Sequence, residues 1–198
     1  MGLGKQAKTL NKAQTQMVSK HLSYGRNGLR NQTIFLLSIK EGLRAKEIAS
    51  LTWKMVMDSD GVVGNSIHLP NSSSKGKSGR IIPLHKDVRD NLSKLLDIQM
   101  RRSTFTVDNH IIQTERANRA SPQSIVNMFW LWYRELGLVG CSSHSGRRTF
   151  ITETSKRIST VGGSLRDIQL MVGHSSLQTT QRYIEGDNQS QRKVVDLI

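Results

Sequence analysis

Apolar positions recur every three or four residues along most of the chain, as in helices that cover a core. The pattern is strongest where "TIFLLSI" precedes Gly42 and where "IVNMFWLWY" follows Pro122. Ser121 can cap the second of these helices, and Ser164 with Asp167 predicts a capping box at another. The predicted helices span residues 9–22, 30–44, 45–51, 87–100 with Asp87 as its cap, 122–136, 142–158 and 165–172.

After the third predicted helix, the pattern changes to short alternating segments rich in β-branched and aromatic residues. Segments 53–57, 62–63 and 67–69 are separated by the turn "DSDG", and "RIIP" follows a stretch rich in Ser and Gly. We expect a small antiparallel three-stranded sheet at one edge, with Lys75 and Lys77 on a loop beside it. The predicted fold class is therefore α+β and mainly α-helical.

Charge is the feature of the composition that changes this picture. The 198 residues include 29 Lys and Arg against 15 Asp and Glu, a net charge of +14, and residues 1–40 contain no acidic side chain. Such an excess is typical of a domain that binds nucleic acid. A membrane-surface helix would also be basic, but the first residues show no amphipathic stripe with Trp or Phe. We expect one domain, preceded by a flexible basic arm over residues 1–8.

The cysteine content and the apolar runs indicate where the protein works. Cys141 is the only cysteine, so no intrachain disulfide can form and a reducing compartment fits. The longest apolar runs are far shorter than a bilayer span, and the first residues lack the charged-then-apolar pattern of a secretion signal. We expect a cytoplasmic protein, associated with the nucleoid and without a membrane partner.

Several kinds of chemistry lack the residues they need. The acidic residues are dispersed, and the one close pair, Asp58 and Asp60, belongs to an ordinary turn. The six His and one Cys show no zinc-binding spacing, and no glycine-rich nucleotide loop is present. We therefore expect no metal and no cofactor.

Two short motifs place cationic side chains where they can meet an anion together. His144 and Arg147 in "HSGR" share one face of a helix, although a solvated basic face has the same pattern. Arg44 in "EGLRAKEI" lies between two predicted helices, where it can reach a phosphate or pair locally with Glu41 or Glu47. Each motif alone is common by chance.

Four motifs in order, "EGLRAKEIASLTW", "KGKSGRIIPL", "HSGRRTF" and "LMVGHSSLQTTQRYI", resemble the catalytic domain of the tyrosine recombinases, the phage-integrase family. The resemblance covers residues 9–184 and is most specific in the last motif. It implies a site-specific recombinase that cleaves and rejoins DNA without metal, ATP or cofactor. The site residues that it implies are Arg44, Lys75, His144, Arg147, His174 and Tyr183, with Lys77 as the alternative to Lys75.

The resemblance also implies a role for each of these residues. Tyr183 would attack a phosphodiester and form a 3′-phosphotyrosyl link, while Arg44 and Arg147 clamp the phosphate in a bidentate way that lysine cannot match. His174 would donate a hydrogen bond to the same phosphate. His144 would relay the tyrosine's proton, and the loop lysine would protonate the leaving 5′-oxygen. The implied partners are double-stranded DNA with specific recombination sites, further copies of the chain in a tetramer, and accessory DNA-bending proteins.

The chain departs from the family pattern at two positions and in its length. Gly146 and Arg148 stand where the family has an apolar residue and often a histidine. Larger members carry an additional DNA-clamping domain before the catalytic one, so we expect either a naturally short recombinase or an excised catalytic domain. The tail, residues 185–198, ends in the apolar "VVDLI" and is expected to dock on a neighbouring subunit.

Two other functions agree with the same composition. One is a type IB topoisomerase-like enzyme, which would use the same chemistry without exchanging DNA partners. The other is a noncatalytic DNA-binding regulator that uses "GLRAKEIASLTWKMV" as a helix-turn-helix reader.

Overall fold

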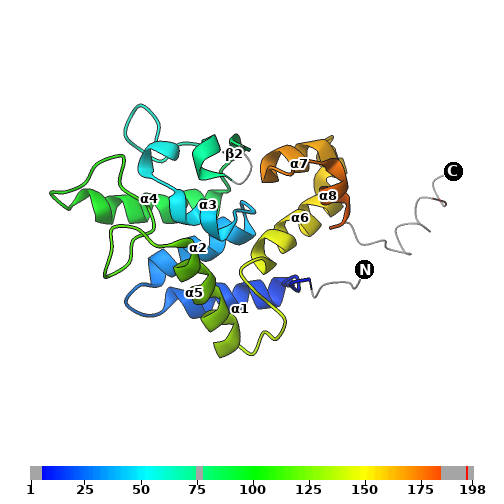
Figure 1. Cartoon of the computed structure of the whole chain (residues 1–198), viewed down its shortest axis with the longest axis horizontal. Coiled ribbons are helices and arrows are strands. Elements are labelled where there is room, and N and C mark those ends of the chain that lie inside the picture. The colour runs from blue at the N-terminus through cyan, green and yellow to red at the C-terminus, as the bar shows by residue number, and fades with distance from the viewer. Residues whose placement is uncertain (1–5, 75–77, 184–194, 196–198) are drawn as a thin grey trace.

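Helices make up most of the protein. The computed structural model describes residues 6–74, 78–183 and Val195. In Figure 1, α6, α7 and α8 gather at one side of the molecule, and α1 to α5 form the larger body beside them. The helices are α1 (Lys12–Ser23), α2 (Gly28–Ile39), α3 (Ala45–Ser50), α4 (Lys86–Met100), α5 (Pro122–Glu135), α6 (Ser145–Arg157), α7 (Leu165–Val172) and α8 (Leu177–Gln181). The strands are β1 (Ser66–Leu69) and β2 (Arg80–Pro83), and the 3-10 helices are η1 (Trp53–Met55), η2 (Asn71–Ser73) and η3 (Ile158–Val161).

Helix α2 passes through the middle of the larger body. Phe35 and Leu37 have no exposed surface, and α1, α4 and α6 all pack against this helix. A helix that carries apolar residues around most of its circumference is expected to be internal, and "TIFLLSI" is such a sequence. The burial of α2 fixes the turn that follows it, which contains Arg44.

The sheet differs from the prediction, because in the described residues it has two strands instead of three. β1 and β2 pair antiparallel, with Ile67 opposite Ile82. Residues 53–55 form the 3-10 helix η1 rather than a strand. Trp53 is fully buried there, and its indole N–H donates to Gln99 Oε1 at 2.9 Å, so packing against α4 determines the backbone of this segment.

The segment after η1 explains why no third strand forms among the described residues. Met57 and Val63 make one isolated antiparallel bridge and then the pairing stops. Asp58 Oδ1 accepts the backbone N–H groups of Asp60 at 3.0 Å and of Val62 at 3.2 Å. These bonds close "DSDG" into a tight turn, and the single bridge beside it is too short to form a strand.

Local capping chemistry determines where the predicted helices begin. Ser121 caps α5, and Ser164 forms the predicted capping box of α7, in which its backbone N–H donates to Asp167 Oδ2 at 2.7 Å. At α4 the cap is His85 rather than Asp87, because His85 Nδ1 accepts the Asp87 N–H at 3.2 Å. A histidine ring here replaces the carboxylate cap that the sequence suggested.

A second, smaller apolar cluster joins α6 to α7 and to Tyr183. Ile151, Ile168 and Val172 are fully buried, and the Tyr183 ring packs against them. Among the helices that the structure describes, none is both long enough and apolar enough to cross a membrane.

Candidate active site

Arg147 lies in the first turn of α6 and is 4% exposed. Its guanidinium donates to the backbone carbonyl of Gly42 at 2.6 Å and to that of Val172 at 2.7 Å. Burial, followed by the positive charges of Arg44 and Arg80, lowers the pKa of Arg147 to about 9. A buried cation held by two neutral carbonyls has unused capacity for an anion.

Arg44 occupies the N-cap position of α3 and approaches Glu47 in the same turn. Its Nη1 lies 3.1 Å from Glu47 Oε1, and its backbone N–H donates to Glu47 Oε2 at 2.9 Å. The local pairing considered from the sequence is therefore present at Glu47. Glu41 instead accepts the backbone N–H of His85 at 2.8 Å.

Glu47 has no exposed side-chain surface and is shared between Arg44 and Arg80. Arg80 Nη1 and Nη2 contact the two carboxylate oxygens at 3.1 and 3.2 Å. Burial opposes ionisation of Glu47, but the hydrogen bonds and charges of Arg80 and Arg44 outweigh it and lower the pKa of this carboxyl. Glu47 is therefore ionised at neutral pH.

His174 and Tyr183 lie against each other after α7. Their rings stack at a centroid distance of 5.6 Å and an angle of 20°. His174 is 7% exposed, and its Nδ1 lies 3.0 Å from Thr180 Oγ1. Burial, together with the charges of Arg147, Arg44 and Arg80, lowers the pKa of His174 to about 4. The imidazole is therefore neutral at pH 7.

Backbone geometry places His174 directly after α7. Gly173 ends this helix in the left-handed region, with φ of 64°, which glycine adopts without strain. Gln169 then fixes the next residue, because its side-chain amide donates to the carbonyl of His174 at 3.0 Å. The carbonyl of Tyr183 accepts from Thr152 Oγ1 at 3.3 Å, so α6 also holds the segment after α8.

The structure brings together four of the six residues that the sequence predicted for the site: Arg44, Arg147, His174 and Tyr183. Arg44 and Tyr183 lie close enough to Arg147 that both affect its pKa. His144 is the exposed N-cap residue of α6, three positions before Arg147. The predicted loop lysine, Lys75 with Lys77 as its alternative, lies outside the described residues.

Sequence reasoning gave no role to Glu47 beyond a local partner and did not name Arg80. The spacing of Glu47 three residues after Arg44 was a usable signal, because such residues face each other on a helix. Arg80 gave no comparable signal, since it is 33 positions from its carboxylate partner. Within the described residues, no three His, Cys, Asp or Glu side chains gather in a way that could hold a metal ion.

Both departures from the family pattern have a structural reason. A Cβ on Gly146 would lie 2.9 Å from Ser38 Cβ and closer still to its hydroxyl, so only glycine lets α6 approach α2 this closely. Arg148 donates to the backbone carbonyl of Ala7 at 2.9 Å. It therefore binds the segment that leads into α1.

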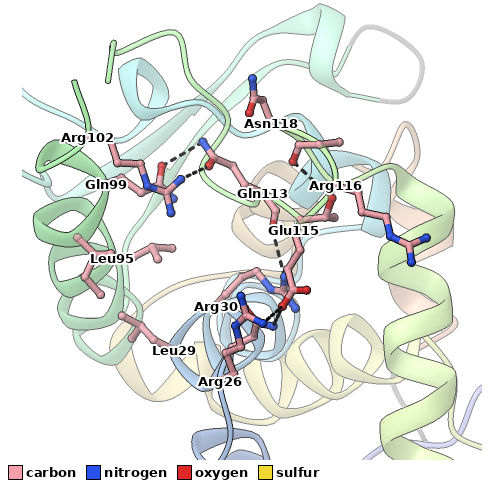
Figure 2. A pocket seen from close by; sticks show the side chains of 14 residues that line it. Arg26, Leu29, Arg30, Leu95, Gln99, Arg102, Gln113, Glu115, Arg116 and Asn118 are labelled. Atoms are coloured by element: carbon pink, nitrogen blue, oxygen red, sulfur yellow. Dashed lines mark hydrogen bonds and ion pairs between the residues drawn. The ribbon is translucent and has the colours of Figure 1, made fainter. Parts of the chain in front are cut away.

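A separate cationic cavity of about 630 Å³ lies where the first turn of α2, the end of α4 and residues 113–118 meet (Figure 2). Arg102 donates to Gln113 Oε1 at 2.7 Å, and Arg30 donates to the carbonyl of the same residue at 3.3 Å. Glu115 is the one carboxylate among the described residues of the lining. The arginines that line this cavity are Arg26, Arg30, Arg102 and Arg116.

Comparison with known proteins identifies the family to which the chain belongs. A family model described as the phage integrase family matches residues 8–190. Tyrosine recombinase XerC of Shewanella oneidensis is 31% identical over 169 residues, which are 85% of this chain and 51% of that protein. XerC of Chlamydia pneumoniae is 31% identical over 160 residues, 80% of this chain and 48% of that protein. The chain thus spans about half the length of the curated relatives it matches.

Solved structures show the same fold. The XerA recombinase has a TM-score of 0.72 at 19% identity and is matched over 100% of this chain and 65% of its own. The Tn1549 transposon integrase, solved with a circular intermediate DNA, has a TM-score of 0.76 at 17% identity, with coverage of 99% and 67%. The fold is that of a tyrosine-recombinase catalytic domain. The chain belongs to the phage integrase family.

Proposed function

We propose that this protein is a site-specific DNA recombinase that cleaves and rejoins DNA through a 3′-phosphotyrosyl intermediate. The observation that carries the proposal is the stacking of Tyr183 on His174, beside an arginine cluster that shares the buried carboxylate of Glu47. A tyrosine hydroxyl beside several guanidiniums is what attack on a phosphodiester requires.

The arginines differ in how many N–H groups they have available for a phosphate. A guanidinium has five N–H groups. Arg44 directs one to Glu47 and Arg147 directs two to backbone carbonyls, which leaves several N–H groups on each. In the proposed reaction these groups bind the nonbridging oxygens, whose negative charge grows as the tyrosine attacks.

His174 is suited to a further hydrogen bond with the same phosphate. Its Nδ1 is engaged with Thr180, so Nε2 is the ring nitrogen left for DNA. If the Thr180 hydroxyl donates to Nδ1, the imidazole carries its proton on Nε2 and can donate it to an oxygen. The low pKa of His174 supports a neutral donor, because protonation would add another cation to an already crowded cluster.

The remaining steps are proton transfers. The tyrosine hydroxyl loses its proton as it attacks. His144 is the proposed relay for that proton, and Lys75 or Lys77 the proposed acid for the leaving 5′-oxygen. Because the phosphotyrosyl link conserves the energy of the phosphodiester, a second 5′-hydroxyl can reverse the step without ATP.

The proposed partner is double-stranded DNA carrying recombination sites, bound by a tetramer of the chain with the help of DNA-bending proteins. The net charge of +14 and the arginine-lined cavity of Figure 2 support binding along the phosphate backbone. The lambda integrase fragment and the XerH recombinase, which share the fold, were solved bound to their DNA sites. The tail, residues 185–198, is proposed to dock on a neighbouring subunit.

Covalent capture from a pool of random DNA sequences tests the proposal, because it requires no defined target site. Nicked duplexes of randomised sequence are incubated with the protein in EDTA, so that a short 5′-hydroxyl fragment diffuses away after cleavage and the adduct is trapped. We expect a protein–DNA adduct that survives denaturation and is absent for Tyr183→Phe. Tyr24→Phe is the matched control, because Tyr24 is 69% exposed.

A second substitution tests the arginine clamp in the same assay. Arg147→Lys should lower the cleavage rate about 10²–10³-fold, as loss of one oxyanion donor does. An adduct that persists in Tyr183→Phe would refute the proposed nucleophile. Relaxation of plasmid without exchange of partners would indicate a topoisomerase-like enzyme, and DNA binding without any adduct would indicate a noncatalytic regulator.

A further inference from the structure

Arg80 connects three elements around the candidate site. Its side chain is 7% exposed and belongs to the first residue of β2. Besides the carboxylate of Glu47, it contacts the backbone carbonyl of Met171 through Nε at 2.6 Å and that of Ser78 through Nη1 at 3.2 Å. One guanidinium therefore joins the hairpin to α3 and to the last turn of α7.

Two of these partners, Glu47 and Met171, lie next to contacts made by Arg44 and Arg147, which the proposed function places on the phosphate. Glu47 is also bonded to Arg44. The carbonyl next to that of Met171 belongs to Val172 and accepts from Arg147. Two guanidiniums thus bind consecutive carbonyls at the negative end of the α7 dipole.

Arg80 itself has almost no donors left for DNA. Four of its five N–H groups are used by the contacts to Glu47, Met171 and Ser78, whereas Arg44 uses one for Glu47. Gly173 leaves room for the Arg80 guanidinium, because a Cβ on Gly173 would lie 2.8 Å from Arg80 Nη1. The arrangement holds Arg80 in one place, whereas four of the five N–H groups of Arg44 have no hydrogen-bond partner among the described residues.

We propose that Arg80 is a positioning residue that occupies the Glu47 carboxylate and thereby keeps Arg44 available for the scissile phosphate. This inference rests on the proposed function. A carboxylate with no exposed surface needs cationic partners, and losing one partner favours a bidentate contact with the guanidinium that remains. Without Arg80, that remaining guanidinium is Arg44, which would turn away from DNA.

The experiment compares Arg80→Met, Glu47→Gln and the double variant. The measured quantity is the single-turnover rate at which each protein forms the covalent adduct with nicked DNA. We expect Arg80→Met to cleave about 100-fold more slowly, as a misplaced catalytic group does, with DNA affinity unchanged. Adding Glu47→Gln should raise the cleavage rate of Arg80→Met at least tenfold, because a neutral amide binds Arg44 more weakly than a carboxylate does. Arg89→Met is the matched control, since Arg89 is exposed and bonded to the Asn65 side chain at 2.7 Å.

The rescue separates positioning from mere support of the fold. If Arg80 only stabilised the structure, Glu47→Gln would add its own defect instead of raising the rate, and that result would overturn the inference. Wild-type cleavage by Arg80→Met would overturn it as well. If Arg80→Met does not fold, Arg80→Lys is used instead. A lysine keeps a charge beside Glu47, so the variant should fold, but its point charge cannot cover both carboxylate oxygens as Arg80 does, so the rate should fall at least tenfold; an unchanged rate would refute the inference.

A readout without DNA distinguishes failure of this inference from failure of the proposed function. The crystal structure of Arg80→Met should show both Nη atoms of Arg44 on the carboxylate of Glu47. If Arg44 keeps its present single contact, the inference is wrong, whether or not the wild-type protein forms the adduct. If Arg44 turns but the wild-type protein forms no adduct, the proposed function fails and the positioning stands.

Discussion

Gly146→Ala tests whether the close approach of α6 to α2 sets the position of Arg147. The added Cβ would lie 2.9 Å from Ser38 Cβ and 3.2 Å from the Ser38 carbonyl carbon. Carbon atoms pack best at about 3.5 to 4.0 Å, so the two helices must separate locally by about 0.6 Å. Such overpacking costs about 1 to 3 kcal/mol, against a helix-propensity gain of at most about 1 kcal/mol.

The contact at the Ser38 hydroxyl is closer than either of these, so the overpacking cost should lie at the upper end of its range and the net loss should be about 2 kcal/mol in the free energy of unfolding, measured by urea unfolding with tryptophan fluorescence. Cleavage should fall more than stability suggests, up to about 100-fold, because Arg147 is the next residue and moves with the helix. Ser38→Gly should recover part of both losses in the double variant, since it removes the side chain that clashes. Gly64→Ala is the matched control, because its Cβ would meet no atom closer than 3.6 Å.

An unfolding midpoint for Gly146→Ala equal to that of the wild type would refute this reasoning. So would a loss of stability that Ser38→Gly does not reduce, because the two substitutions would then act independently. The Ser38 hydroxyl adds a third comparison, since it is buried with no hydrogen-bond partner among the described residues. Ser38→Ala should therefore change stability little or raise it by up to about 1 kcal/mol.

Three further outcomes are expected. Burial raises the pKa of Glu41 to about 7, so its folded-state proton makes stability fall as pH rises from about 4.5 to 7. In Glu41→Gln this pH-dependent loss, about 3 kcal/mol in the free energy of unfolding by pH 8, should be absent. Curves of unfolding free energy against pH that run parallel for the two proteins would contradict this. Replacing Lys5, Lys8 and Lys12 by Ala should reduce the salt slope of DNA binding by about 0.9 for each phosphate that these lysines neutralise; an unchanged slope would place them in solvent. Cys141→Ser should cleave normally, because Cys141 is half-buried against the core; loss of cleavage with an intact fold would indicate a role in the site.

Local signals in the sequence predicted much of the fold and of the candidate site. The caps at Ser121 and Ser164 act within one turn of their own helix, so their residue types suffice to place α5 and α7. Arg147, His174 and Tyr183 were predicted as site residues because their motifs resemble those of the family, and they remain predictions as far as their roles are concerned.

The parts that were missed depend on contacts between distant segments. Trp53 lies in β-favouring sequence, and a strand was predicted there. In the structure its indole bonds to Gln99 and the segment forms a 3-10 helix. Arg80 reaches Glu47 and α7 only after the hairpin folds back on them, and no local pattern encodes such a meeting. Gly146 resembles a weakened helix start in the sequence, whereas in the structure it allows α6 to approach α2.

In the proposed function, the arginine cluster also links folding to the DNA substrate. Arg44, Arg80 and Arg147 converge on one carboxylate and the end of one helix, so part of their mutual repulsion persists in the native state. An anion that binds among the three arginines relieves this repulsion. It binds the folded state, because only folding brings the arginines together. By mass action, a ligand at 100 times its Kd stabilises the fold by about 2.7 kcal/mol. Bound DNA would then stabilise the fold as well as react with it, and the region around Tyr183 would be most stable in the DNA-bound protein.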